Sequence, residues 1–376
     1  MKKNLSKIIC LLICGILFVS CFSGCGQTTP DITAAPTAEP TPSPTPLPVV
    51  EISYTDGKVV DPYRLYNSDN VAHDVLALGQ VYPDLIKVQS IGKSYFGKEM
   101  FVFYLGKGST SVLMTASNHA RENVDTNLLM REAEEIAYAY TNNQSFAGYD
   151  SEKIKELLDN YTICICPMNN PDGVDIVNTG IDPEGITAND YDKITWKANG
   201  RGVDPNRNFP YCWEEMKADD VDHLERAKMN FPGDEPASEP EVQNLMNLVK
   251  SNDFKFCINF HTKGKVVYWR DAHMGEIPGD EKLAKLIGNC LDFEVAGVTK
   301  SNQSYGGGFE NWFRQETGNP GICCEMTQGG EGDIPYNHPN RGSLAKAGVF
   351  DIYSERVLDW NRSSKIMLYL LDNYFS

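Results

Sequence analysis

The sequence predicts an α/β fold, and three observations support this. Short apolar runs rich in β-branched residues recur along the chain, as expected for buried strands of a sheet. Helical patterns separate these runs, and this alternation is typical of α/β proteins. Hydrophobic residues make up 41% of the chain and aromatic residues 10%. That content can bury a substantial core and excludes a disordered protein.

Individual elements follow from these patterns. Strands are predicted at Met100–Leu105, Ser111–Thr115, Tyr161–Cys166, Phe254–Phe260, Val266–Trp269 and Gly321–Cys324. Helices are predicted at Asn127–Tyr140, after Ser238, at Asp280–Cys290, and from Ser343 to about Asp372. Ser238-Glu239-Pro240-Glu241 has the pattern of a capping box, with Ser238 as the cap and Glu241 bonding back to it.

The first 25 residues have the pattern of an export signal. Three lysines precede an apolar stretch of 12 residues, Ile8 to Val19, which is shorter than the ~20 residues of a membrane-spanning helix. Small residues and then Cys25 follow, as in bacterial lipoprotein signals that are cleaved before a lipid-carrying cysteine. Cys21 is an alternative lipidation site, and an ordinary secretory signal is an alternative interpretation. We expect an exported, extracytoplasmic protein, held at the outer face of a bacterial cytoplasmic membrane by lipid on Cys25.

Residues 26–50 are predicted to form a linker. From Gln27 to Pro48, seven of 22 residues are Pro and six are Thr, a composition that favours extended polyproline geometry over a packed core. No second linker or internal repeat follows. Residues 51–376 are therefore predicted to form one domain.

Charge excludes two classes of partner. The chain has 51 acidic and 34 basic side chains, for a net charge of −17. Nucleic-acid binding needs clustered Lys and Arg, and docking on an anionic membrane needs a basic surface. We therefore expect no nucleic-acid partner, and membrane contact only through the N-terminal lipid.

Eleven cysteines suggest a disulfide framework or a zinc finger at first sight. Three leave with the signal, Cys25 would carry lipid, and five of the remaining seven lie in predicted apolar strands. A free cysteine in such a strand packs as a small hydrophobic residue. We predict a buried core rather than disulfides.

Three predicted strands run directly into residues with metal or acid–base chemistry. His119 and Glu122 follow the second strand, His261 follows the fourth, and Glu325 follows the last. In open α/β sheets, functional sites gather beyond the C-terminal ends of the strands. His119 and Glu122 have the i, i+3 spacing at which two side chains can face one point. With His261 they would form a His₂Glu set that leaves zinc an open position, as in catalytic sites. An HxxE spacing alone is common by chance, however.

Five motifs in order reduce that ambiguity. They are Asn118-His119-Ala120-Arg121-Glu122, Pro167-Met168-Asn169-Asn170-Pro171-Asp172-Gly173, Gly202-Val203-Asp204-Pro205-Asn206-Arg207-Asn208-Phe209, Asn259-Phe260-His261-Thr262 and Cys324-Glu325-Met326. Together they resemble the zinc carboxypeptidase family, over roughly Tyr66 to the C-terminus. Trp196–Arg201, Ser238–Glu241 and Gly307–Trp312 resemble its bacterial branch of γ-D-glutamyl–diamino acid peptidases, which trim peptidoglycan stem peptides.

The resemblance implies a single-domain α/β/α fold, with a mixed central β-sheet flanked by helices on both faces. It also implies one zinc ion per chain, held by His119, Glu122 and His261. The zinc would bring the pKa of its bound water toward ~7 and polarise the scissile carbonyl. Glu325 would act as the general base that takes the proton of the water and returns it to the leaving nitrogen. A strand-end carboxylate in a salt bridge is the alternative for Glu325.

Substrate-binding roles also follow from the resemblance. Asn206 and Arg207 match the pair that grips the terminal carboxylate of a substrate, for which a planar guanidinium is suited. Arg121 matches a substrate-contacting arginine. Each could instead serve a structural role, because an arginine near a cleft often neutralises carboxylates.

One position departs from the family. The arginine that stabilises the transition state commonly follows the tryptophan equivalent to Trp196, but Lys197 occupies that place here. The oxyanion needs a nearby cation or oriented donor. We expect Arg201 to supply it, with Lys197 as the alternative.

Two further residues fall near specificity positions. Tyr305 is near the place of the mobile tyrosine of the family, although counting back from Trp312 puts that place nearer Gln303. Glu310 falls where the family sets its side-chain preference. A carboxylate there would favour the ammonium of Lys or diaminopimelate, but a glutamate at a helix start is also favoured by the helix dipole.

The sequence thus predicts a monomeric zinc metallocarboxypeptidase. It would hydrolyse a peptide bond near a C-terminal or diamino-acid residue of a peptide or muropeptide. A zinc-dependent deacylase of N-acyl amino acids is one alternative, and a non-catalytic binding lipoprotein is another.

Overall fold

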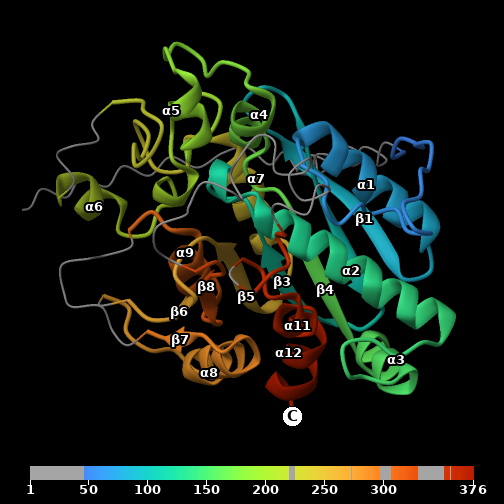
Figure 1. The fold of residues 1–376 in the computed structure, drawn as a ribbon. Helices are drawn as coiled ribbons and strands as arrows, with labels where there is room; N and C mark the ends of the chain where they lie inside the picture. Colours follow the sequence, from blue (N-terminus) through green and yellow to red (C-terminus); the bar gives the residue numbers. More distant parts are fainter. Residues whose placement is uncertain (1–45, 220–224, 272, 297–305, 329–350, 356) are drawn as a thin grey trace, which may run out of the picture. The chain divides into compact units, whose positions relative to one another are not determined.

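A mixed eight-stranded β-sheet runs through the described part of the chain. The computed structural model describes residues 46–219, 225–271, 273–296, 306–328, 351–355 and 357–376 (Figure 1). The strands are β1 (Ile86–Lys93), β2 (Glu99–Gly106), β3 (Thr110–Thr115), β4 (Tyr161–Cys166), β5 (Phe254–His261), β6 (Val266–Tyr268), β7 (Glu294–Val295) and β8 (Gly321–Glu325). Their order across the sheet is β1-β2-β4-β3-β5-β8-β6-β7.

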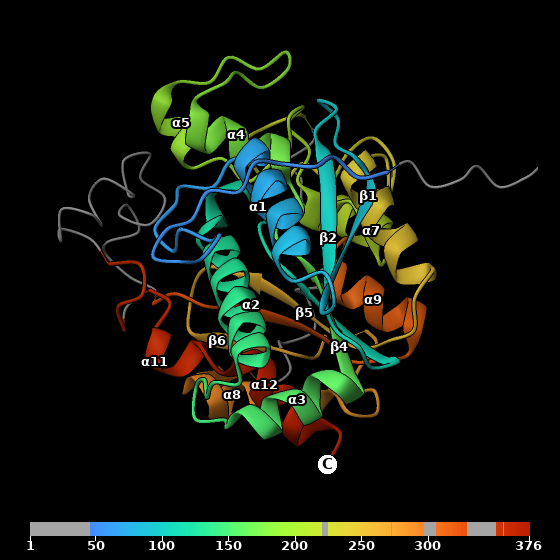
Figure 2. The same cartoon turned by 90° about the vertical axis from the view of Figure 1, so that its right-hand side faces the viewer.

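Helices connect and cover these strands (Figures 1 and 2). They are α1 (Ser68–Val81), α2 (Val124–Asn142), α3 (Ser151–Asn160), α4 (Pro171–Thr179), α5 (Asp190–Ile194), α6 (Trp213–Asp219), α7 (Pro240–Lys250), α8 (Asp280–Leu291), α9 (Phe309–Thr317), α11 (Trp360–Ser363) and α12 (Ile366–Tyr374). Two 3₁₀ turns, η1 (Ala120–Glu122) and η2 (Pro205–Arg207), lie between them. None of the described helices combines the length and apolar character needed to cross a membrane.

Strand alternation divides the core between the two faces of the sheet. Phe256, Ile258 and Phe260 of β5 pack into a cluster with α1, α2, α8 and α12. Cys257, between them in sequence, packs into a second cluster with α7 and α9. Successive strand side chains point to opposite faces, so a strand buried on both faces is apolar throughout. The predicted mixed α/β sheet with helices on both faces is confirmed.

Four central strands run in parallel. β3 pairs in parallel with β4 and β5, and β5 pairs in parallel with β8. The register of the last pair places His261 opposite Glu325. The carboxyl ends of these strands therefore meet at one edge, which is the geometry that the sequence predicted for the functional residues.

All six predicted strands are present within one or two residues of their expected bounds. Two strands were not predicted. β1 has Ile86 as its only fully buried residue because it lies at the sheet edge, so its sequence lacks the apolar run of a central strand. β7 has only two residues.

The predicted capping box at Ser238 is wrong. Glu239 is the N-cap of α7, and no side chain of the described residues caps that helix. The Ser238 hydroxyl instead donates to Glu239 Oε1 at 2.6 Å, and Glu241 Oε1 accepts from the backbone N–H of Tyr95 at 2.9 Å. Pro240 has a preset φ and no N–H to satisfy, which makes it a favourable first helical residue without a side-chain cap.

The predicted continuous C-terminal helix is also wrong where the structure describes it. Residues 351–355 and 357–359 are not helical, α11 has four residues, and Ser364 and Lys365 separate it from α12. The prediction at Ser343 lies outside the described residues.

The cysteines behave as predicted. All seven within the described residues are free thiols, and those in β4, β5 and β8 are buried. The five strand cysteines lie in the sheet core, whereas Cys212 is half-buried and Cys290 lies in α8.

A buried ion pair connects α8 to α9. Asp280 and Arg314 are at most 1% exposed. Arg314 Nε donates to Asp280 Oδ1 at 3.3 Å, and its Nη2 donates to Gly275 O at 2.6 Å. We predict that Arg314→Leu lowers the free energy of unfolding by about 3–5 kcal/mol, because Asp280 would stay buried without a counter-charge.

Urea unfolding measures this effect. The matched control is Lys285→Leu, which removes a lysine 61% exposed in its ion pair with Glu281 of the same helix and should cost at most about 1 kcal/mol. Equal losses in the two variants would contradict the prediction.

Candidate metal centre

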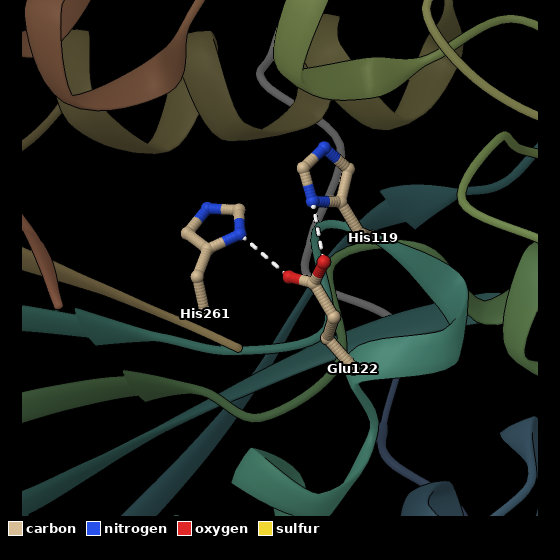
Figure 3. A group of neighbouring side chains, drawn as sticks. All are labelled: His119, Glu122 and His261. Carbon is tan, nitrogen blue, oxygen red and sulfur yellow. Dashed lines mark hydrogen bonds and ion pairs between the residues drawn. The ribbon is translucent and has the colours of Figure 1, made fainter. Parts of the chain in front are cut away.

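Two strand ends and one short turn bring three candidate metal ligands together (Figure 3). His119 immediately precedes η1, and Glu122 is the last residue of that turn. His261 is the last residue of β5. The backbone N–H groups of Ala120 and Arg121 donate to the carbonyls of Lys197 and Trp196, which holds the turn against a loop distant in sequence.

Both histidines direct Nδ1 at the Glu122 carboxylate. His119 Nδ1 lies 3.0 Å from Glu122 Oε1, and His261 Nδ1 lies 2.8 Å from Glu122 Oε2. One ligand atom from each residue lies within 4.8 Å of the others, and all three residues are buried. Two imidazole nitrogens and a carboxylate oxygen at this separation suit zinc with one open position.

Buried polar groups lie beside the outer nitrogen of each imidazole. His119 Nε2 lies 3.2 Å from Asp204 Oδ1, and His261 Nε2 lies 2.8 Å from the side-chain amide of Asn259. Metal-binding histidines usually donate their outer N–H to a carboxylate or carbonyl oxygen, which fixes the ring orientation. Asp204 offers such an acceptor to His119, whereas Asn259 presents its amide nitrogen, a donor, to His261. Neither partner was assigned a role from sequence. Asn259 lies two residues before His261 in β5 and therefore on the same face, which could have identified it.

Electrostatics keep Glu122 ionised. Burial by itself raises the pKa of Glu122, but the charges of His119 and Lys197 hold that pKa well below its usual range. A carboxylate must be deprotonated to bind a metal. His119, Glu122 and His261 therefore suit the zinc ion that the sequence predicted.

Glu325 occupies a different environment from Glu122. It is the last residue of β8, and its Oε2 is buried without a hydrogen-bond partner among the described residues. Burial, followed by repulsion from Glu122, raises the pKa of Glu325 to about 7. Two carboxylates whose environments separate their pKa values in this way suit different tasks, one as ligand and one as proton carrier.

A pocket opens over this group. Its lining includes His119, Lys197, Asn206, Arg207, His261, Glu310 and Glu325. Asn206 Oδ1 accepts from Asn118 Nδ2 and from the Phe309 N–H, each at 2.9 Å. Arg207 is half-buried, and its Nη1 donates to the carbonyl of Asn206 at 2.9 Å.

The two candidate oxyanion cations lie in different places. Lys197 lines the pocket, with Nζ 3.4 Å from Glu122 Oε1. Arg201 is not among the lining residues, because its guanidinium makes two hydrogen bonds to the buried Glu239 carboxylate, at 2.8 and 2.6 Å. It also lies over the Tyr95 ring, 5.0 Å from the centroid. The structure therefore gives Arg201 an ion-pair partner outside the pocket.

Two other predicted substrate-binding residues are not found among the described residues that line the pocket. Arg121 is half-buried in η1 and is not among the residues lining the pocket. Tyr305 lies outside the described residues.

A buried pair of histidines and a glutamate beside a second carboxylate is typical of metal-dependent hydrolases. The family model for zinc carboxypeptidases matches residues 74–341. This match spans more than half of the chain, which belongs to the zinc carboxypeptidase family and is a peptidase. Zinc is the cofactor of this family, and His119, Glu122 and His261 are the described residues that could hold it.

Two relatives show the range of the family. Gamma-D-glutamyl-L-diamino acid endopeptidase 1 of Lysinibacillus sphaericus is 28% identical over 289 residues, covering 72% of this chain and 68% of the relative. Carboxypeptidase B of Astacus astacus is 26% identical over 271 residues, covering 68% of this chain and 83% of the relative.

Solved structures share the fold. Thrombin activatable fibrinolysis inhibitor aligns with a TM-score of 0.62 at 15% identity, covering 84% of this chain and 76% of that chain. Carboxypeptidase A from Helicoverpa armigera aligns with a TM-score of 0.60 at 14% identity, covering 85% and 76%.

Proposed function

We propose that this protein is a zinc-dependent metallocarboxypeptidase that hydrolyses the peptide bond next to a C-terminal or diamino-acid residue, in peptidoglycan stem peptides. The observation that carries the proposal is the pocket, in which Glu325 and Arg207 share one lining with His119 and His261. The similarity to an endopeptidase named for γ-D-glutamyl-L-diamino acid bonds supports this substrate class. We further propose that the protein acts as a monomer.

Proton transfer is assigned to Glu325. When bound, zinc supplies a Lewis acid that lowers the pKa of water and polarises a carbonyl. A carboxylate with a pKa of about 7 can accept a proton from water near neutral pH and return it to the leaving nitrogen. The unpartnered Oε2 leaves Glu325 free to do both.

Substrate binding is assigned to the cationic and amide side chains around the pocket. Arg207 presents a guanidinium that can bind a terminal carboxylate through two oxygens, and Asn206 lies beside it. Hydrogen bonds to Asn118 and to the N-terminus of α9 fix the Asn206 side chain. Arg121 is a weaker candidate for substrate contact because it does not line this pocket.

We assign the oxyanion to Lys197 rather than Arg201. The Lys197 ammonium lies beside the ligand carboxylate, in the pocket where the carbonyl oxygen gains charge. Arg201 could reach that charge only by leaving Glu239 buried and unpaired, which is costly.

The first prediction from this proposal concerns Glu325. We expect Glu325→Gln to retain one zinc per chain and to lower kcat by about 10²–10⁴-fold, as expected for loss of a general base. Mass spectrometry of muropeptides, a generic C-terminal peptide and N-acyl amino acids would measure turnover, with an EDTA-treated sample as the metal-free control. Unchanged turnover in the variant would overturn the mechanism. Turnover of acyl-amino acids alone would indicate a deacylase, and no turnover of any substrate would indicate a binding protein.

The second prediction separates the two cations. We expect Lys197→Met to lower kcat by about 10²–10³-fold, the cost of losing an oxyanion donor, with little change in the urea midpoint, because Glu122 keeps its contacts to His119 and His261. Arg201→Met should lose less kcat and unfold at lower urea concentration, because the buried Glu239 carboxylate loses its counter-charge. The opposite pattern would return the role to Arg201.

We also propose export and lipid anchoring at Cys25. The support is sequence alone, because residues 1–45 lie outside the described residues. Cys25→Ala is expected to abolish incorporation of a labelled fatty acid in a bacterial host, and Cys21→Ala to retain it. The reverse result would move the anchor to Cys21, and labelling of neither protein would favour an ordinary secretory signal.

A further inference from the structure

The pocket contains one more cation than the proposed reaction needs. Arg207 is assigned to the substrate carboxylate and Lys197 to the oxyanion, but Arg270 also lines the pocket. It follows β6 by two residues, and the last residue of that strand, Tyr268, pairs with Cys323 of β8.

Arg270 has donor capacity to spare. Its Nε is buried and has no hydrogen-bond partner among the described residues. Among the described residues its guanidinium makes one ion pair, with Glu276, whose Oε2 lies 3.8 Å from Nη1 and whose side chain is half exposed. An ion pair so long and so exposed contributes little. The guanidinium is therefore available to a ligand anion.

Glu310 supplies an opposite charge in the same pocket. It is 6% exposed, and its Oε2 accepts one hydrogen bond, from Asn259 Nδ2 at 3.1 Å. It lies in the first turn of α9, where the helix dipole favours an anion. A buried carboxylate with one amide partner retains acceptor capacity for a ligand ammonium.

These two charges do not neutralise each other. Both side chains are described, and no ion pair joins Arg270 to Glu310. A side chain that carries only an ammonium would satisfy Glu310 and leave the arginine without a ligand anion. A side chain that carries both an ammonium and a carboxylate complements both.

We propose that Glu310 and Arg270 form a subsite for a side chain that ends in a zwitterion, as in diaminopimelate. Glu310 binds the distal ammonium and Arg270 binds the distal carboxylate. The inference rests on the proposed function, and it makes this chain selective for a diamino dicarboxylic acid over lysine. Arg270 is thus a specificity residue rather than a catalytic one.

Three peptides test the subsite. All have the form L-Ala-γ-D-Glu-X, where X is diaminopimelate, lysine (which lacks the distal carboxylate) or 2-aminopimelate (which lacks the distal ammonium). We expect kcat/KM to be highest for diaminopimelate. Arg270→Met should lower the diaminopimelate-to-lysine ratio of kcat/KM at least about tenfold, the loss expected for a hydrogen bond between charged groups. Glu310→Gln should lower the diaminopimelate-to-aminopimelate ratio by a similar factor.

The controls separate specificity from folding. Arg362→Met removes a half-exposed arginine in α11, which does not line the pocket, and should leave both ratios unchanged, and Arg270→Lys should restore part of the first ratio. Zinc content of each variant reports an intact site. Arg270→Met lowering kcat/KM for all three peptides in parallel would overturn the subsite, as would wild-type rates within about twofold across the three.

Binding to Glu325→Gln, measured by calorimetry with the same peptides, judges the subsite apart from catalysis. Tight and selective binding of the diaminopimelate peptide without turnover by the wild type would sustain the subsite and reject the proposed peptidase function. Turnover of all three peptides without selectivity would support the peptidase function and reject the subsite.

Discussion

Parallel pairing of β3, β5 and β8 is the constraint on which the site depends. Because these strands run in the same direction, the residues that follow β3 and those that end β5 and β8 meet at one edge of the sheet. The register places His261 opposite Glu325, and η1 brings His119 and Glu122 to the same edge. A one-residue slip of β8 would direct Glu325 to the other face, since side chains alternate along a strand. The apolar residues of β5 and β8 therefore also hold the chemistry in place.

The site concentrates buried charge, and the surrounding structure compensates that charge unevenly. Glu122 lies between two imidazoles and a lysine, so it remains ionised. Glu325, nearby, has no hydrogen-bond partner on Oε2 among the described residues, and its pKa rises. Glu239 is neutralised by Arg201, which lies four residues after Lys197. Glu122 and Glu325 thus acquire different protonation behaviour from their surroundings rather than from their residue type.

Local patterns predicted most of the sheet because a strand buried on both faces must be apolar throughout. β3, β4, β5 and β8 satisfy that condition, and their sequences show it. Edge strand β1 does not, since only Ile86 is fully buried. At Ser238–Glu241 the local pattern instead predicted a feature that does not form. The residue types match a capping box, but the Glu241 carboxylate accepts a hydrogen bond from the backbone N–H of Tyr95 instead. That partner is 146 residues away and is invisible to a four-residue pattern.

The sequence by itself determined the family and the candidate ligands, because motif order and an i, i+3 spacing survive folding unchanged. It also determined that the cysteines belong to the core, since apolar flanking residues bury whatever lies between them. Our proposal of Lys197 over Arg201 depends on the tertiary structure. The difference is Glu239, which is 38 residues from Arg201 in sequence and bonded to it in space. The placement of Arg270 in a pocket with Glu310 is likewise tertiary. Electrostatic pairing depends on distance through space, and no spacing along a chain reports that distance.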